Sequence, residues 1–292
     1  MDKEQIIKAG KISQEVKTYA KSIIKKDMLL LEIANKIEEK IFELGGEPAF
    51  PTNLSINEIA AHYTPAYDDE TKASGLLKVD LGVQINGWIA DTAFSLDLEN
   101  SEENKRIIEA AEDGLKAAEK ILSSKTTLSQ IGEAIETAIN KKGFNPVSNL
   151  SGHSMEEYDL HAGITIPNVK NNSNAEIGEG LFAIEPFATS GVGKIYDGKP
   201  SGIYQLVSAK SIRNQNAREV LEYITTYYST LPFASRWLVE EFGTKALIAL
   251  KQLEQNENIH QYDQLVESSK AKVAQAENTF IVEKDKVIKT SE

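Results

Sequence analysis

Two runs of mainly apolar residues separated by an Asn-Gly pair constrain this chain more than any other feature. The runs are Leu76–Ile85 and Trp88–Phe94, with Asn86-Gly87 between them. Asn and Gly both accept the positive φ that a two-residue hairpin turn requires, so this pair is a strong local hairpin signal. The sequence therefore predicts an antiparallel hairpin whose register places Gly82 opposite Asp91.

The predicted register brings two carboxylates to one face of the hairpin. Asp80 and Asp91 become diagonal neighbours, with β-carbons roughly 7 Å or less apart. Both lie among apolar residues, where two ionised carboxylates suffer desolvation and mutual repulsion unless a cation joins them. A divalent metal removes both costs. The alternative is that each Asp caps a strand end or pairs with a lysine on a solvated face.

The remaining candidate ligands are few because the chain has no cysteine and only four histidines. Any metal must therefore be held by histidine and carboxylate. His153 and His161 lie in turn-rich sequence, where functional side chains are often placed; the alternative, which is favoured for any single histidine taken alone, is a structural role. His260, beyond a polar helix end, is expected to be a surface residue.

Two glutamates stand where a carboxylate is unusual. Glu185 follows the apolar run Leu181–Ile184, and Glu277 leads into a predicted terminal strand. Glutamate is rarely buried unless it is paired, so each is either an exposed edge residue or a ligand. Together with the two aspartates and one histidine they make an oxygen and nitrogen ligand set that suits manganese, iron, cobalt or zinc.

Helical and extended periodicities alternate along the chain. Two helices are expected in the first 45 residues, and helical spacing returns late in the chain. The expected elements are two helices up to Gly45-Gly46, a loop over 47–53, the hairpin, a helix over 100–123 opened by Asn100, a helix over 128–142, short strands and loops over 145–212, helices over 216–253, and a hairpin over 278–289. This order indicates an α+β protein with a helical insertion.

Composition excludes several classes of protein. The 292 residues allow one large domain or two modest ones. The formal charge of −12 has the wrong sign for a chain whose main partner is nucleic acid. The longest uninterrupted apolar run, Ala246–Leu250, is far shorter than the ~20 residues of a membrane helix. Because Met1–Glu4 also lacks a signal-peptide pattern, a cytoplasmic location is expected.

Several longer motifs carry a resemblance to a known family. They are Pro48–Asn53, Ala61–Pro65, Val79-Asp80 with Asp91-Thr92, Gly152–Ser154, Leu160–Gly163, Phe182–Phe187 and Gln275-x-Glu277. In these motifs, and over essentially the whole chain, the sequence closely resembles the type 2 methionine aminopeptidases in their short archaeal form.

The resemblance implies the α+β pita-bread fold of the creatinase and aminopeptidase relatives, with a helical insertion between Glu185 and Glu277. It divides the chain into a metallopeptidase domain of residues 1–205 plus 271–292 and an insertion subdomain of residues 206–270. The implied activity is hydrolytic removal of the initiator methionine from peptides and nascent proteins whose second residue is small.

The resemblance also implies a role for individual residues. Two divalent ions, of manganese, iron, cobalt or zinc, would be held by Asp80 on one metal, by Asp91 and Glu277 across both, and by His153 and Glu185 on the other. Glu185 would also be the general base. His62 and His161 would contact the substrate backbone and stabilise the developing oxyanion. The wall of the methionine pocket would consist of Phe50, Leu160, Phe187, Pro232 and Tyr262.

The implied partners are the N-termini of peptides and nascent proteins, with the ribosome as a candidate meeting place. No direct nucleic-acid or membrane partner is expected, and the chain is expected to be a monomer. Three positions depart from the usual motifs: Gln84, Ala276 and Asn278. None is a ligand, so we expect effects at the rim or on local packing.

Two alternatives remain. A prolidase or an aminopeptidase P would use similar ligands in the same fold, although the context of His62 and Asn53 and the helical insertion favour the methionine enzyme. A non-enzymatic pita-bread protein that docks on ribosomes or nucleic acid would typically lose ligands and carry basic tails. Here all five ligands are present and the charge is −12, so the enzyme is favoured.

Overall fold

The computed structural model describes residues 1–291. Its first layer is a three-stranded sheet in the order β1-β3-β4, built from β1 (Glu47–Ile56), β3 (Leu76–Ile85) and β4 (Trp88–Asp97). Two helices, α1 (Lys3–Ile23) and α2 (Leu30–Glu43), cover one face of it, as the sequence predicts. Alternate strand residues such as Val79 and Leu81 face these helices, so Asp80 and Gly82 face the other way.

The predicted loop over residues 47–53 is wrong, because this segment is the first part of β1. The strand lies at the edge of its sheet and its pairing with β3 shifts register twice, between Pro48 and Phe50 and between Phe50 and Asn53. Edge strands and bulges are the places where a sheet accepts proline, which cannot donate a ladder hydrogen bond. The interrupted register therefore accommodates Pro48 and Pro51.

A second helix-backed layer faces the first. Helices α3 (Glu102–Ile121) and α4 (Leu128–Lys141) share a core with residues of the second set of strands. Ser101, and not Asn100 as predicted, caps α3 by accepting a hydrogen bond from the Asn104 amide. Asn100 has a φ of 54°, so it makes the turn that precedes the helix. Thr127 and Gln130 form a capping box at the start of α4.

The strands of this second layer form two short sheets. One has the order β15-β14-β8-β6-β7 and the other the order β13-β9-β5. Their bounds are β5 (Asn145–Pro146), β6 (Ser151–Met155), β7 (Thr165–Pro167), β8 (Gly180–Ile184), β9 (Phe187–Thr189), β13 (Val273–Gln275), β14 (Asn278–Val282) and β15 (Val287–Lys289). The antiparallel pairing of β14 with β15 confirms the predicted terminal hairpin.

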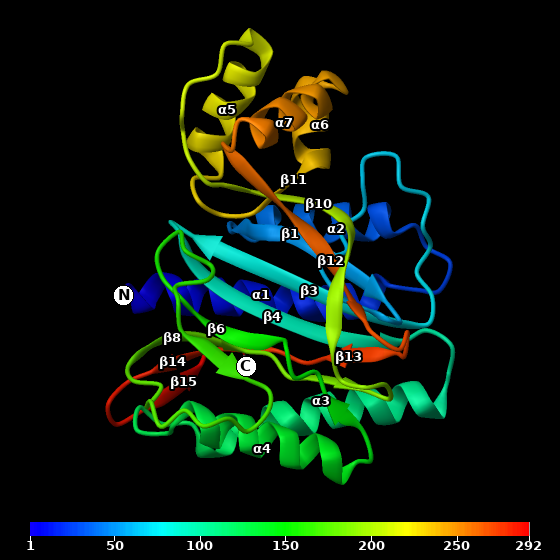
Figure 1. Cartoon of the computed structure of the whole chain (residues 1–292), viewed down its shortest axis with the longest axis vertical. Coiled ribbons are helices and arrows are strands. Elements are labelled where there is room, and N and C mark those ends of the chain that lie inside the picture. The colour runs from blue at the N-terminus through cyan, green and yellow to red at the C-terminus, as the bar shows by residue number, and fades with distance from the viewer. Residues whose placement is uncertain (292) are drawn as a thin grey trace.

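The late helical periodicity corresponds to three helices with a core of their own, α5 (Gln215–Tyr227), α6 (Ser235–Phe242) and α7 (Lys245–Gln255). They stand on a sheet of order β11-β10-β12-β2, made of β2 (Ile59–Ala61), β10 (Ile195–Leu206), β11 (Phe233–Ala234) and β12 (Ile259–Glu267). Figure 1 shows these helices at the top, the β3–β4 hairpin across the middle, and α3 and α4 at the bottom. Within residues 1–291, no helix is long and apolar enough to cross a membrane.

The close approach of α1 to the C-terminal segment gives a stability prediction. A β-carbon on Gly10 would lie 2.2 Å from the Thr290 carbonyl oxygen, whereas one on Gly114 in α3 would lie 3.1 Å from its nearest neighbour, Pro186 Cβ. Both substitutions to alanine gain about 1 kcal/mol of helix propensity, so their difference isolates the clash. We expect Gly10→Ala to be less stable than Gly114→Ala by roughly 1–3 kcal/mol, the usual cost of overpacking. Urea unfolding followed by circular dichroism measures this, and equal midpoints would contradict it.

Candidate metal centre and active site

The hairpin that carries the two aspartates has the predicted register. Asp80 lies opposite Ala93 and Gly82 lies opposite Asp91. Asn86 and Gly87 have φ values of 50° and 82°, as a two-residue turn of the primed type requires. The Gln84 side-chain oxygen accepts a hydrogen bond from the Gly87 amide at 2.7 Å. Gln84 therefore stabilises the turn at the tip of the hairpin.

Two threonine hydroxyls fix β4 against β14 at the level of Asp91. The Thr279 hydroxyl accepts from the Asp91 amide at 2.7 Å and donates to the Asp91 carbonyl at 2.8 Å. The Thr92 hydroxyl donates to the Glu277 carbonyl at 2.9 Å. These contacts join the first layer to the second, and they set the Asp91 and Glu277 backbones at a fixed separation.

Both glutamates lie where a chain leaves one sheet and enters another. Glu185 separates β8 from β9, and Glu277 separates β13 from β14. The pairings of β8 with β14 and of β9 with β13 share one antiparallel register, so Glu185 lies opposite Glu277 in the gap. Two like charges in facing positions destabilise a sheet unless a cation lies between them.

His153 completes the group from β6, which pairs with β7 and β8. Its Nε2 atom is 3.6 Å from Asp91 Oδ2 and 3.7 Å from Glu185 Oε1. Ligand atoms of Asp91, His153 and Glu277 all lie within 4.8 Å of one another, and the three residues are buried. Side chains from four separate strands or strand breaks therefore meet at one point.

The charges at this point are strongly perturbed. Burial raises the pKa of Asp80 to about 7. Burial and then the repulsion of neighbouring carboxylates raise the pKa values of Asp91, Glu185 and Glu277 well above the ordinary range. Burial lowers the pKa of His153 to about 3, so the imidazole is neutral. A neutral histidine is the form that binds a metal.

The residues present fit a divalent metal ion. Asp80 Oδ1, Asp91 Oδ1 and His153 Nδ1 are buried without a hydrogen-bond partner, and no lysine or arginine lines the cavity in the part of the chain that the structure describes. Buried polar atoms ordinarily find partners. Hard oxygen and imidazole ligands match first-row divalent ions.

Gln275 is a residue of this site to which the sequence analysis gave no role. Its amide nitrogen lies 3.3 Å from Glu277 Oε2 and 3.5 Å from both Asp80 Oδ2 and Glu185 Oε2. One neutral donor thus contacts three carboxylates. The Gln275-x-Glu277 spacing was the available signal, because residues two apart on a strand share a face.

The carboxylates form the floor of a cavity of about 380 Å³. The twelve predicted site residues all line it: Phe50, His62, Asp80, Asp91, His153, Leu160, His161, Glu185, Phe187, Pro232, Tyr262 and Glu277. The proposed metal ligands and the apolar residues of the predicted wall therefore line one space. His260 is exposed and does not line the cavity.

The two cavity histidines are held differently. His62 has a φ of 62°, an uncommon conformation for a residue with a side chain. Its Nδ1 atom lies 3.1 Å from the Asp263 carbonyl oxygen, which can only accept, so Nδ1 carries the proton. Burial lowers the pKa of His62 to about 4, which leaves Nε2 as an acceptor. The ring of His161 lies 4.5 Å from that of His153.

The structure also shows the surroundings of two residues that depart from the expected motifs. Ala276 lies in the core beneath α3 and α4, away from the cavity. Asn278 is buried, and its side-chain oxygen accepts from the Ser291 hydroxyl at 2.7 Å. Both residues therefore contribute to packing around Glu277.

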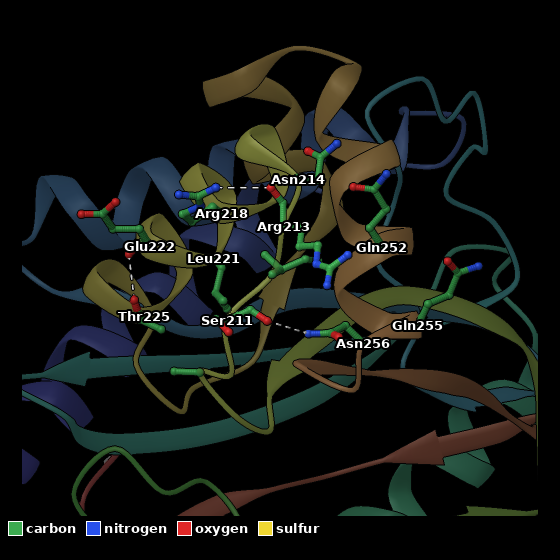
Figure 2. Close-up of a pocket in the computed structure, with 12 residues that line it drawn as sticks. Ser211, Arg213, Asn214, Arg218, Leu221, Glu222, Thr225, Gln252, Gln255 and Asn256 are labelled. Carbon is green, nitrogen blue, oxygen red and sulfur yellow. Dashed lines mark hydrogen bonds between the residues drawn. The ribbon is translucent and has the colours of Figure 1, made fainter.

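A larger hollow of about 1,070 Å³ lies elsewhere, between α5 and α7. Figure 2 shows polar side chains around it, including Arg213, Arg218 and Gln252. It contains neither a histidine nor more than one carboxylate. Size alone would therefore select a hollow without the chemistry of the hairpin cavity.

Comparison with known proteins decides the family. Residues 4–226 match the model of metallopeptidase family M24. The chain is 46% identical over 297 residues to the methionine aminopeptidase of Pyrococcus abyssi, with 100% of both chains covered. The chain belongs to the methionine aminopeptidases of metallopeptidase family M24.

Solved structures show the fold of these methionine aminopeptidases. The Thermotoga maritima methionine aminopeptidase matches with a TM-score of 0.71 at 17% identity, covering 99% of this chain and 96% of that one. A thermophilic Arx1 matches with a TM-score of 0.85 at 14% identity, covering 98% and 89%. The predicted α+β pita-bread fold is confirmed.

The raised pKa of Asp80 gives a prediction for metal binding. Below about pH 7 a metal must displace a proton from Asp80, and above it the carboxylate is already ionised. His62 and His153, with pKa values near 4 and 3, stay neutral throughout. We expect Mn²⁺ to raise the melting temperature more at pH 8 than at pH 6, because affinity rises up to tenfold per pH unit for each proton released.

Differential scanning calorimetry with Mn²⁺ or with EDTA measures this effect. Asp91→Asn should lose most of the Mn²⁺-induced rise, whereas Asp197→Asn, an exposed aspartate outside the cavity, should keep it. A rise of equal size at both pH values would contradict the assignment.

Proposed function

We propose that this chain hydrolyses the first peptide bond of peptides and nascent proteins that begin with methionine and continue with a small residue. The observation that carries the proposal is the cavity, in which four carboxylates and a histidine lie beside an apolar wall. Support also comes from full-length relatives named methionine aminopeptidase at 35–46% identity. The correspondence to type 2 enzymes rests on the motifs and on the helices between Glu185 and Glu277.

The proposed metal centre would hold two divalent ions. Their ligands would be Asp80, Asp91, His153, Glu185 and Glu277. When bound, such ions lower the pKa of water and polarise a carbonyl group. Manganese, iron, cobalt and zinc all accept these ligands. Gln275 keeps the carboxylates apart and oriented, since its amide contacts three of them.

The two cavity histidines would bind the substrate backbone through hydrogen bonds. His62 Nε2 accepts, because Nδ1–H donates to the Asp263 carbonyl, so it is suited to the N–H group of the scissile bond. His161 would donate to the carbonyl oxygen as negative charge develops there. Glu185 takes a proton from the attacking water and passes it to the leaving amino group.

The methionine side chain would lie against the apolar wall. Phe50, Leu160 and Phe187 are buried, and Pro232 and Tyr262 complete the wall. The Tyr262 hydroxyl donates to the Gln205 side chain at 2.6 Å, so its polar end is satisfied away from the ligand. An unbranched, polarisable thioether suits such a wall.

The alternatives have less support. A prolidase or aminopeptidase P would share the ligands, but the relatives that match over their full length are methionine aminopeptidases. A non-enzymatic binding protein of this fold would not need five such ligand side chains around one cavity. We propose residues 1–205 with 271–292 as the metallopeptidase domain, 206–270 as the insertion, and a cytoplasmic monomer whose partners are peptide and nascent-protein N-termini.

The role of Glu185 is testable by an isosteric change. Glu185→Gln keeps the shape of the side chain and removes its ability to accept a proton, so turnover of a Met-Ala peptide should fall by about 10²–10⁴-fold. Methionine release is measured at matched metal content and melting temperature. Glu179→Gln, in the loop before β8, should retain full activity. Normal turnover by a metal-loaded Glu185→Gln protein would refute the role.

Peptides that differ only in their second residue test whether its size or its charge decides the rate of cleavage. In the proposed complex the scissile bond lies beside four carboxylates, those of Asp80, Asp91, Glu185 and Glu277. A carboxylate on the second residue of the substrate would therefore be repelled, even when metals offset part of that charge. We expect Met-Ala to be cleaved faster than Met-Asn, and Met-Asp to be slower than its neutral isostere by about tenfold or more. Ratios of kcat/KM over the three peptides measure this. Equal rates for Met-Asn and Met-Asp would show that size alone decides.

A further inference from the structure

A second cavity, of about 360 Å³, lies between the layer formed by α2, β1 and β3 and the helices α5 and α6. It is lined from α2, from the tip of the β3–β4 hairpin, and from α5 and α6. Pro232 lines both this cavity and the proposed active site. The two spaces therefore share one wall, yet no proposed metal ligand lines the second cavity.

Aromatic rings form one side of this cavity. Tyr223 lies 4.4 Å from Tyr227 and 5.8 Å from Tyr228 between ring centroids, and Tyr228 lies 5.6 Å from Trp237. Tyr227 is 65% exposed, and Phe42 on α2 is 60% exposed. The rings therefore make a continuous wall whose outer members meet solvent, as at sites that receive a partner.

Three carboxylates, Glu47, Glu240 and Glu241, line the same cavity. Among residues 1–291 no lysine, arginine or histidine nitrogen lies within 4.0 Å of their oxygens, and no basic side chain lines the cavity. After burial, the charges of Glu241 and Glu240 help to raise the pKa of Tyr223. The carboxylates thus act on the aromatic wall, and the cavity has negative charge without a cation.

We propose that this cavity binds the guanidinium group of an arginine side chain presented by a peptide or protein partner. Anions are repelled, and an apolar ligand would desolvate the carboxylates without compensation. A metal ion would find aromatic faces in place of oxygen ligands on one side. A guanidinium is flat, weakly hydrated and always charged, so it stacks on rings and pairs with carboxylates at once.

The chain already uses this chemistry in a neighbouring position. The Arg236 guanidinium lies over the Trp237 ring, 5.6 Å from its centroid, and pairs with the buried Glu38 carboxylate. Trp237 also lines the second cavity. An arginine from a partner would repeat this arrangement at a site with three carboxylates and five aromatic rings, and the exposed Tyr227 and Phe42 would contact its backbone.

Trp237 is a natural reporter, because the chain has only two tryptophans. In a Trp88→Phe protein its fluorescence is read during titration with the capped peptides Ac-Gly-Arg-Arg-Gly-NH₂ and Ac-Gly-Gln-Gln-Gly-NH₂. We expect a saturable change with the arginine peptide alone. The double variant Glu240→Gln/Glu241→Gln should weaken it about tenfold or more, and Tyr227→Leu several-fold.

A matched control removes the same two charges elsewhere. Glu102→Gln/Glu103→Gln, in the first turn of α3, should leave peptide affinity within about twofold. Circular dichroism and Met-Ala turnover should be unchanged in every variant. A response to the glutamine peptide of equal size, equal weakening by the α3 control, or no weakening by the Glu240/Glu241 variant would each overturn the proposal.

Discussion

Mutual repulsion among Asp80, Asp91, Glu185 and Glu277 is the constraint on which the rest of the structure depends. Two unit charges 4 Å apart repel by about 4 kcal/mol at the effective dielectric typical near a protein surface. Glu277 is only 1% exposed, so water offers little relief. Groups that repel one another stay together only if the backbone holds them and a proton or a cation neutralises part of their charge.

The fold holds the four carboxylates close together, and the cation that neutralises them must come from solution. Thr279 and Thr92 bind the two layers to each other beside Asp91 and Glu277. Lys78 is 1% exposed and lies on the Asp80 face of β3, yet its amino group donates to the Asn57 carbonyl at 2.8 Å and lies within 4.0 Å of no carboxylate in residues 1–291. A lysine that paired with Asp80 would occupy a ligand position. The structure thus keeps the available cations out of the cavity, as a metal centre requires.

Local signals predicted the part of the site that is local in sequence. Asn86-Gly87 fixed the hairpin, and the hairpin brought Asp80 and Asp91 together, because a two-residue turn determines every later pair. The prediction of a loop over residues 47–53 is wrong because register shifts in the pairing of β1 with β3 allow this strand to contain prolines. The prediction of Asn100 as the N-cap of α3 is wrong because the Ser101 hydroxyl, one residue later, accepts the capping hydrogen bond.

The meeting of Glu185, Glu277 and His153 was not predictable from spacing. It depends on β8 pairing with β6 and β14, whose partners lie 30 residues (His153 and Ala183) and 94 residues (Ile184 and Asn278) apart, and such long-range pairing leaves no periodic trace in either strand. Resemblance to a family named these residues, and long-range pairing explains why they meet. Gln275 shows the limit of the motif: its spacing from Glu277 accounts for one contact, but its contacts with Asp80 and Glu185 depend on long-range strand pairing.

The insertion is oriented by a small buried polar network. Glu38 on α2 accepts from Arg236, from Trp237 Nε1 at 2.8 Å and from the Thr52 amide at 2.9 Å. Arg236 also donates to the Thr64 hydroxyl, which donates to the Thr52 carbonyl at 2.8 Å. Buried ion pairs add little net stability, but they favour one arrangement over others. Pro232 lines both the proposed methionine pocket and the second cavity, and Trp237 lines the second cavity. The two contacts of Glu38 on α2 with Arg236 and Trp237 on α6 therefore help to position the wall that both spaces share.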